Sequence, residues 1–370
     1  MKKYLLIICF FPLAAFAQSS YTVCNASGVK ADYYSLQGAI DSAVAGSILY
    51  ILPSANNYGT AILNKKLIIF GTGYMLDQNS EPAASPNTNG VVLDAIAFKT
   101  GSSGSYVDGL QITVDIGPLT YRVLLDSVAN ITINHCHINL HSDFSTSLIY
   151  TRNSYNCFFE HCFFVLAGNN VNHSAGIFYR ENGTGSQNIH FDNNIVDCRN
   201  PVLGLSVNQY GVDPAYWGSI YFAYNTFYMS LGSSFFANAT CHDNFFINSD
   251  PTTPINLSTM YFNGPAYNNI TNAPGLFPNA NGNYRNANAD SVFVYSTFGY
   301  HSWDEKWRVR DTSFAKTYSS DGGEVGAYSG TDPYKLSGLS PLPYIYSLSV
   351  VRDPAIRGNV KIHIKAKANN

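Results

Sequence analysis

The sequence is poor in charge. Only 12% of its 370 residues are Asp, Glu, Lys or Arg, whereas about a quarter is usual for soluble chains. The formal net charge is −3, so there is no excess of basic side chains to neutralise phosphates. We therefore expect no nucleic-acid partner.

Long hydrophobic runs are absent except at the N-terminus. There, Lys2 and Lys3 precede an apolar run over residues 4–16, and Ala15-Phe16-Ala17 has the small-residue pattern of a cleavage site. This arrangement predicts a signal peptide over residues 1–17. A membrane anchor is the alternative, but the run is short for a spanning helix. We expect a secreted, periplasmic or outer-surface monomer with no transmembrane segment in its mature part.

Cysteine is present but not in the dense, regular spacing of a disulfide scaffold. Six cysteines follow the predicted signal peptide: Cys24, Cys136, Cys157, Cys162, Cys198 and Cys241. Their positions have another explanation, which is an internal repeat.

Five segments share the pattern x-apolar-x-apolar-x-x-(Cys/Asn)-x-apolar. They are NITINHCHINL (130–140), NCFFEHCFFVL (156–166), NIHFDNNIVDC (188–198), SIYFAYNTFYM (219–229) and NATCHDNFFIN (238–248). An earlier copy, YVDGLQIT (106–113), has Leu110 at the Cys/Asn place. The spacing varies between 19 residues (Asn225 to Asn244) and 32 residues (Cys162 to Asn194). Constant rungs with variable loops between them account for this variation.

The repeat predicts a strand, a bend and a second short strand in each copy. Alternating apolar residues bury one face of the strand, and two polar residues then break the alternation. A rung this short cannot bury its face alone, so stacked rungs must form one continuous core. Aromatic residues at 14% and abundant Asn and Gly also favour β-structure with many turns.

These features resemble the right-handed parallel β-helix (pectate-lyase-like) superfamily, in particular secreted repeat proteins of the Bacteroidota type. The inward Asn194, Asn225 and Asn244 resemble its asparagine ladder. Residues 33–54 resemble its N-terminal capping helix followed by a first strand. The resemblance implies an all-β solenoid over residues 18–330 and a small C-terminal β segment over 331–370, in which YIYSLSVV (344–351) and GNVKIHIKAKA (358–368) can form a hairpin. It implies little about activity, because this fold carries lyases, hydrolases, epimerases, adhesins and scaffolds.

The histidines of NITINHCHINL suggest a metal site at first sight. In the repeat, however, Cys136 points inward while His135 and His137 point outward, so they cannot converge on one zinc ion. His135 and His161 share an outward turn column, and we interpret them as two histidines on the outer wall of the solenoid that could contact a ligand. Cys136 and Cys162 are stacked, but their parallel side-chain vectors suit a disulfide poorly.

A polysaccharide lyase is one functional hypothesis. Asn134, Glu160 and Asp192 occupy one outward column on consecutive rungs, and their oxygen atoms are of the kind that Ca²⁺ prefers. Glu160 and Asp192, with Arg180 from a connecting segment, are the candidate catalytic residues for removing a proton beside a uronate carboxylate. No cofactor is otherwise expected.

Glycan binding without catalysis is the leading hypothesis. Phe163, Tyr221 and Phe245 occupy outward columns, where exposed rings could stack on sugars together with Asn134, His135 and His161. The alternative is that long loops between the rungs cover these rings. We expect a polysaccharide or cell-surface glycan as the partner, and a purely structural surface protein is the third hypothesis.

Overall fold

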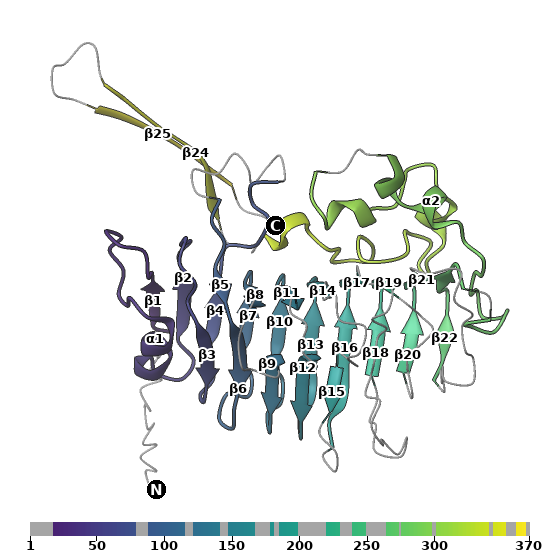
Figure 1. Ribbon diagram of the computed structural model, residues 1–370, viewed down its shortest axis with the longest axis horizontal. Coiled ribbons are helices and arrows are strands. Elements are labelled where there is room, and N and C mark those ends of the chain that lie inside the picture. The colour runs from purple at the N-terminus through teal and green to yellow at the C-terminus, as the bar shows by residue number, and fades with distance from the viewer. Residues whose placement is uncertain are drawn as a thin grey trace, which may run out of the picture.

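The computed structural model describes residues 18–78, 88–114, 121–140, 147–166, 178–180, 185–198, 220–229, 239–248, 264–273, 275–297, 301–339, 343–352 and 360–367. The predicted signal peptide lies outside these residues. Within them, the chain winds repeatedly through three parallel sheets whose strands stack in register (Figure 1). The fold is therefore a parallel β-helix, as the repeat predicts.

The first sheet has ten strands, and the second has eight. In stacking order, the first contains β1 (Ser20–Val23), β2 (Ile48–Ile51), β4 (Ile68–Phe70), β7 (Tyr106–Asp108), β10 (Thr132–Asn134), β13 (Tyr155–Glu160), β16 (Gln187–Asp192), β18 (Ile220–Ala223), β20 (Ala239–His242) and β22 (Ala266–Tyr267). The second contains β5 (Val92–Leu93), β8 (Gln111–Val114), β11 (His137–Leu140), β14 (Phe163–Leu166), β17 (Ile195–Cys198), β19 (Thr226–Met229), β21 (Phe245–Asn248) and β23 (Ile270–Thr271).

The third sheet completes the early rungs. Its strands are β3 (Thr60–Leu63), β6 (Ala95–Phe98), β9 (Tyr121–Asp126), β12 (Ser147–Arg152) and β15 (Phe178–Arg180). The cysteines serve the packing between the sheets: all six in the described chain are buried and free. Cys136 and Cys162 are therefore not joined by a disulfide.

The N-terminal end is capped by α1 (Leu36–Ser42), whose Leu36, Ala39 and Ile40 are buried. The Ser35 hydroxyl accepts a hydrogen bond from the Gly38 amide and so satisfies a free donor at the start of the helix. The helix was expected from the sequence, but β2 is not the first strand, because β1 precedes it and pairs with it.

The turn between the first and second sheets has the same backbone shape in every late rung. Its first residue adopts positive φ, from 46° at His135 to 56° at Asn193 and Asp243. The next residue points into the core, where the asparagines form a continuous ladder: Asn194, Asn225, Asn244, Asn269 and Asn283. The repeat predicted the first three members, and the structure adds the last two.

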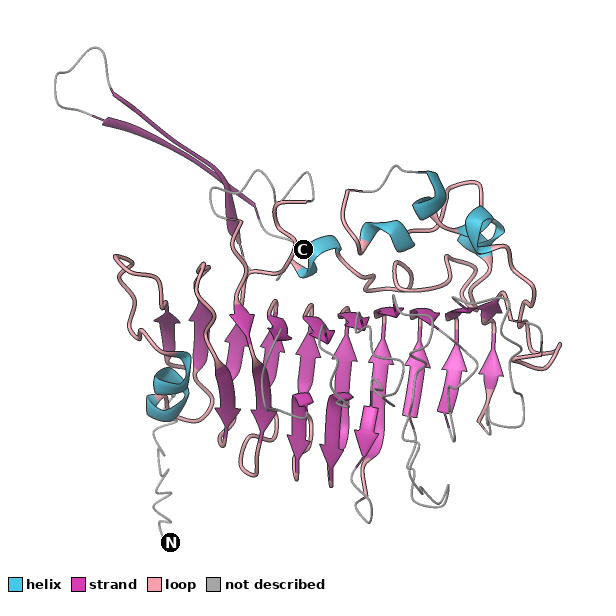
Figure 2. Cartoon of the chain, in the orientation of Figure 1, coloured by secondary structure: helices cyan, strands magenta, loops and turns pink. Residues whose placement is uncertain are grey.

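A C-terminal strap covers the outer face of the second sheet (Figure 2). We define the strap as residues 287–297 and 301–338, which include α2 (Ala289–Val292) and the 3₁₀ turns η4 (Val294–Thr297), η5 (Glu305–Trp307), η6 (Phe314–Thr317) and η7 (Leu336–Gly338). Its buried Phe293 and Trp307 pack with Phe163 and Phe245 of the sheet in a second hydrophobic cluster. The strap therefore gives the second sheet a core on each side.

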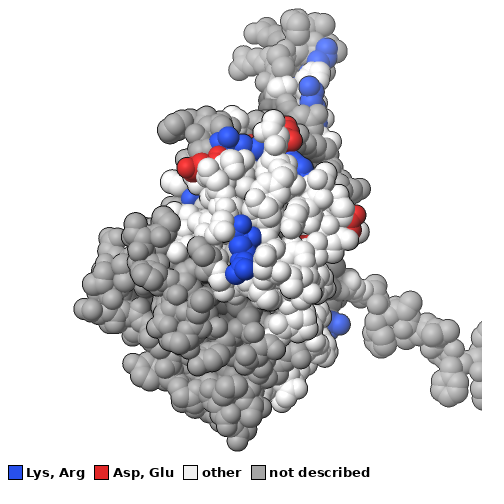
Figure 3. Space-filling view, turned by 90° about the vertical axis from the view of Figure 1, so that its right-hand side faces the viewer, with Lys and Arg blue, Asp and Glu red and all other residues white. Residues whose placement is uncertain are grey.

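The last described element is an antiparallel hairpin of β24 (Tyr344–Arg352) and β25 (Val360–Lys367), which projects from the body (Figure 1). Val360, Ile362 and Ile364 on one face of β25 are more than half exposed. On the described part of the end shown in Figure 3, Lys, Arg, Asp and Glu form a few small groups among uncharged residues. None of the described helices is long and apolar enough to cross a membrane.

Candidate functional site

The outer face of the first sheet brings together the column that the repeat predicts. Asn134 pairs with Glu160, and Glu160 pairs with Asp192, in the parallel register of β10, β13 and β16. Parallel register places equivalent residues about 4.8 Å apart. Glu160 and Asp192 are thus adjacent carboxylates at the ends of neighbouring strands.

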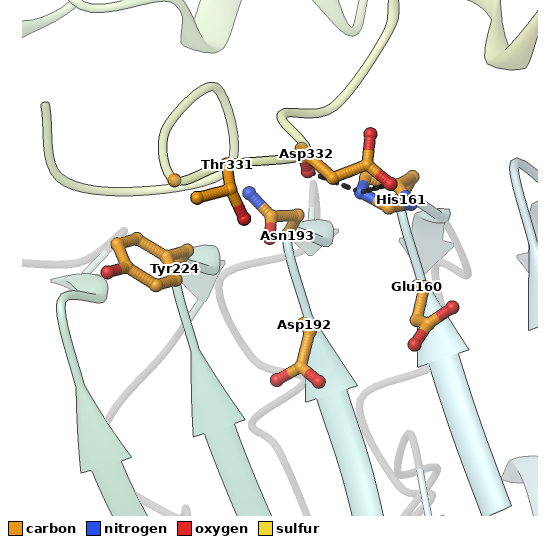
Figure 4. Close-up of a pocket in the computed structure, with 8 residues that line it drawn as sticks. Glu160, His161, Asp192, Asn193, Tyr224, Thr331 and Asp332 are labelled. Carbon is orange, nitrogen blue, oxygen red and sulfur yellow. Dashed lines mark hydrogen bonds and ion pairs between the residues drawn. The ribbon is translucent and has the colours of Figure 1, made fainter.

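A cavity of about 180 Å³ opens between this end of the sheet and the strap (Figure 4). The sheet and its turns supply the floor, and residues 330–332 of the strap form the opposite wall. The lining residues are Glu160, His161, Asp192, Asn193, Tyr224, Gly330, Thr331 and Asp332. Three of them are carboxylic acids and none is Lys or Arg, so the cavity is acidic.

The two floor carboxyls disfavour each other's charge. Burial raises the pKa of Asp192 to about 7, and the nearby Glu160 carboxylate adds to the effect. The pKa of Glu160 is also raised, by burial first and then by Asp332, although the nearby His135 opposes the shift. Near neutral pH the pair therefore holds a proton for part of the time.

His161 joins the sheet to the strap. Its Nε2 donates to the Asp332 backbone carbonyl at 2.6 Å, and its Nδ1 lies 2.8 Å from the Asn134 amide oxygen. Burial, followed by the neighbouring His135, lowers the pKa of His161 to about 4. The two imidazoles stack with ring centroids 4.9 Å apart. The column predicted for this pair is confirmed, but His135 is buried beside Asp108, so it offers no surface to a ligand.

Asn134, the first of the predicted calcium ligands, is buried and held by other side chains. This residue is 8% exposed, and its amide is held between Tyr106, to whose hydroxyl Nδ2 donates at 2.9 Å, and His161. Its oxygen therefore does not face the cavity as a free ligand. No three His, Cys, Asp or Glu side chains in the described part of the chain are grouped so that they could hold a metal ion. As held here, Asn134 does not fit the role of a Ca²⁺ ligand, and the Ca²⁺ site stays a prediction.

Arg180 does not lie beside Glu160 and Asp192, which we call the acid pair, in the register of the strands. It lies at the end of β15 in the third sheet and pairs with Thr151, whereas Glu160 and Asp192 lie in the first sheet. The sequence places Arg180 in a segment that connects two rungs, but it does not show which sheet the strand of Arg180 joins. The structure therefore does not bring the three predicted catalytic residues together on one sheet.

The expectation of exposed aromatic rings is wrong for Phe163 and Phe245. Both are 0% exposed, because the strap covers their column. Tyr221 remains partly exposed, but its ring stacks on His190 with centroids 4.5 Å apart, and His190 stacks on Phe158 at 4.8 Å. Mutual stacking covers ring faces that a sugar would need.

The sequence pattern did not identify the strap side of the site. Asp332 and Thr331 lie about 170 residues from His161 along the chain and outside any repeat. The sequence pattern also did not identify Asn193 and Tyr224 of the turns as cavity residues. Their positive φ at every rung is the only local signal, and it concerns the backbone.

The strand pairing defines the class of protein, a right-handed parallel β-helix. No protein-family model matches the chain, and no curated protein matches it. It is similar to a solved pectin methylesterase from carrot (11% identity, TM-score 0.41, 74% of this chain and 90% of that one). It is also similar to a pectin methylesterase from Aspergillus niger (12%, 0.36, 80% and 97%) and to an alginate lyase of the PL6 family (12%, 0.25, 80% and 58%). Similarity at this level extends no further than the fold.

Proposed function

We propose that this chain is an exported β-helix protein that binds a glycan in the cavity between the first sheet and the strap. The observation that carries the proposal is the composition of this cavity: carboxyl, amide and hydroxyl side chains line a small open space. Such groups hydrogen-bond to the hydroxyls of a sugar and fix its orientation. The volume is below the roughly 300–1,000 Å³ of drug-sized sites, which suits one sugar unit or a chain end.

Binding is favoured over catalysis because the part of the cavity wall that the structure describes contains no Lys or Arg. A lyase that acts on a uronate must neutralise the substrate's carboxylate, and three acidic side chains repel it instead. Arg180, the expected cationic group, belongs to another sheet.

A steric variant tests the proposal directly. Thr331 is exposed on the strap and lines the cavity, so Thr331→Trp should fill it. Thr312→Trp is the matched control, because Thr312 is exposed on the same strap but is not part of the lining. On an array of neutral, acidic and basic glycans, we expect the wild type and the control to retain the same ligand and Thr331→Trp to lose at least 10-fold in affinity. A blank array, or equal binding by all three proteins, would overturn the proposal.

A polysaccharide lyase is the second candidate, and one observation favours it. The pKa of Asp192, about 7, suits a base that removes a proton at neutral pH. Asp192 would take the proton beside the uronate carboxylate, a carbon–carbon double bond would form, and the glycosidic oxygen would leave. The unsaturated product absorbs ultraviolet light. If acidic polysaccharides give no such absorbance with the wild type, this candidate is excluded.

A further inference from the structure

The cavity offers a ligand almost only hydrogen-bond acceptors. Glu160, Asp192 and Asp332 line it, and none of the described lining residues is a Lys or Arg that would balance their charge. His161 contributes no free donor, because Nε2 is engaged by the Asp332 carbonyl and Nδ1 by the amide of Asn134. Among the side chains of the lining, the Thr331 hydroxyl is the donor left to a ligand, because the Tyr224 hydroxyl is directed away from Asp192 and Asn193 (Figure 4). A ligand that fits must therefore be rich in donors.

Asn193 provides a second, independent sign of a ligand. Its side chain donates from Nδ2 to the Ala327 carbonyl at 2.9 Å and to the Ser329 carbonyl at 2.6 Å, which fixes the amide between the turn and the strap. Both hydrogens are thereby used, and Oδ1 receives no donor from the residues that the structure describes. Asn193 is only 7% exposed and lines the cavity beside Asp192 (Figure 4). Asn193 Oδ1 can therefore accept a hydrogen bond from an N–H or O–H of a ligand in the cavity.

The charge of the cavity points the same way. Glu160 and Asp192 are half-buried neighbours in register, and two like charges in such a place require either a shared proton or a cation. Asp332 adds a third carboxyl from the opposite wall. A metal ion is disfavoured, because the amide of Asn134, the next oxygen donor of the column, is engaged by Tyr106 and His161. An ammonium group satisfies the same charge with looser geometry and donates three hydrogen bonds.

We propose that the cavity binds a protonated amino-sugar unit of a glycan, with the ammonium between Glu160 and Asp192 and a donor of the ligand directed at Asn193 Oδ1. This inference rests on the proposed glycan-binding function and names its ligand class. Binding exchanges the proton shared by the acid pair for the positive charge of the ligand. No covalent step is involved.

The experiment compares glucosamine oligomers with their N-acetylated counterparts, which have the same length and hydroxyls but no charge. Calorimetry at pH 7 in 150 mM salt should show at least 10-fold tighter binding of the amine form. Titrations in two buffers of different ionisation enthalpy should show proton release on binding. Asp192→Asn should lose at least 10-fold in affinity for the amine form and abolish the proton release.

Controls separate a built site from general attraction between a basic oligomer and an acidic protein. Asp311→Asn removes a fully exposed strap carboxylate outside the cavity and should leave affinity unchanged. Equal losses in Asp311→Asn and Asp192→Asn would overturn the inference. If a neutral or acidic glycan binds in a Thr331→Trp-sensitive manner and the amine has no advantage, the inference fails and the proposed function stands. If no glycan binds, both fail. Tight binding of Ca²⁺ alone, competing with the amine, would reassign the site to a metal cation.

Discussion

At the residue scale, Asp192 occupies an unfavourable position for a carboxylate. Burial, and then the Glu160 carboxylate that the parallel register places beside it, raise the pKa of Asp192 to about 7. An aspartate is normally ionised well below that pH. The β-helix therefore carries an unfavourable carboxyl pair, as expected of a binding site whose charge a ligand completes.

Replacing Asp192 by Asn should stabilise the protein at alkaline pH. Because the pKa is higher in the folded chain than the ordinary value of 3.8, the folded state binds more protons between these values. The stabilisation from this group is complete below about pH 4 and is lost as the pH rises through 7. At pH 8 we expect the free energy of unfolding of Asp192→Asn to be higher than that of the wild type by on the order of 1–2 kcal/mol. Each pKa unit corresponds to about 1.36 kcal/mol, and the sum is discounted because the carboxyl is partly exposed.

Urea unfolding at pH 5 and pH 8 measures this difference. His161, whose pKa is lowered to about 4, contributes the opposite slope below its ordinary pKa, but it is present in both proteins and cancels in the comparison. Asp311→Asn, a change at an exposed carboxylate, should alter neither value. Equal stability of Asp192→Asn and the wild type at pH 8 would show that the acid pair is not strained.

At the scale of elements, the asparagine ladder in the turns links neighbouring rungs and so helps to fix their register. Asn225 is 0% exposed. Its Nδ2 donates to the Phe191 carbonyl at 2.8 Å and to Asn244 Oδ1 at 2.9 Å, and its Oδ1 accepts from the backbone and side chain of Asn194. Each asparagine thus satisfies buried groups of the rungs on both sides.

Asn225→Ala should lower the free energy of unfolding by about 3–5 kcal/mol, because several buried polar groups lose their hydrogen-bond partners at about 1–3 kcal/mol each. Chemical denaturation followed by circular dichroism measures the loss. Asn279→Ala changes an exposed asparagine and should shift the free energy of unfolding by less than about 0.5 kcal/mol. Similar effects of the two substitutions would mean that the ladder does not stabilise the turn.

The sequence allowed the columns of this ladder to be predicted because each rung repeats one local pattern. Cys136, Cys162, Asn194, Asn225 and Asn244 all lie at the predicted place between strands that pair in register. The strap could not be predicted in the same way. It has no repeat, and its contacts with the turns join residues from 50 to 171 positions apart. The three cavity residues that the strap supplies could therefore not be predicted from a local pattern.

At the scale of the whole molecule, the strap runs back along the stack over the turn column. Tyr318 accepts from Asn268, Ser320 donates to Asp243, and Asp332 accepts from His161. These contacts follow the rungs in reverse order. The strap thus ties together rungs that otherwise contact only their neighbours, and it also forms one wall of the cavity.

The buried pair of Lys306 and Asp197 anchors the strap to the second sheet. Their side chains meet at 2.7 Å, with Asp197 0% and Lys306 11% exposed, and the ammonium lies 4.5 Å from the centre of the Trp307 ring. Lys306→Met should destabilise the strap by about 3–5 kcal/mol, because it leaves Asp197 buried without its lysine. In hydrogen exchange, we expect the strap and Phe163 to lose protection while the inner Phe159 keeps it.

The double variant Lys306→Met/Asp197→Leu separates charge from packing. Replacing both partners by apolar groups of similar volume removes the unpaired carboxylate, so most of the lost stability should return. Glycan binding should follow the same order, weakest in Lys306→Met and restored in the double variant, because the strap wall forms only when the strap is docked. If Lys306→Met binds the ligand as well as the wild type while its strap exchanges freely, the strap is not part of the site. Binding would then depend on the floor of the first sheet alone.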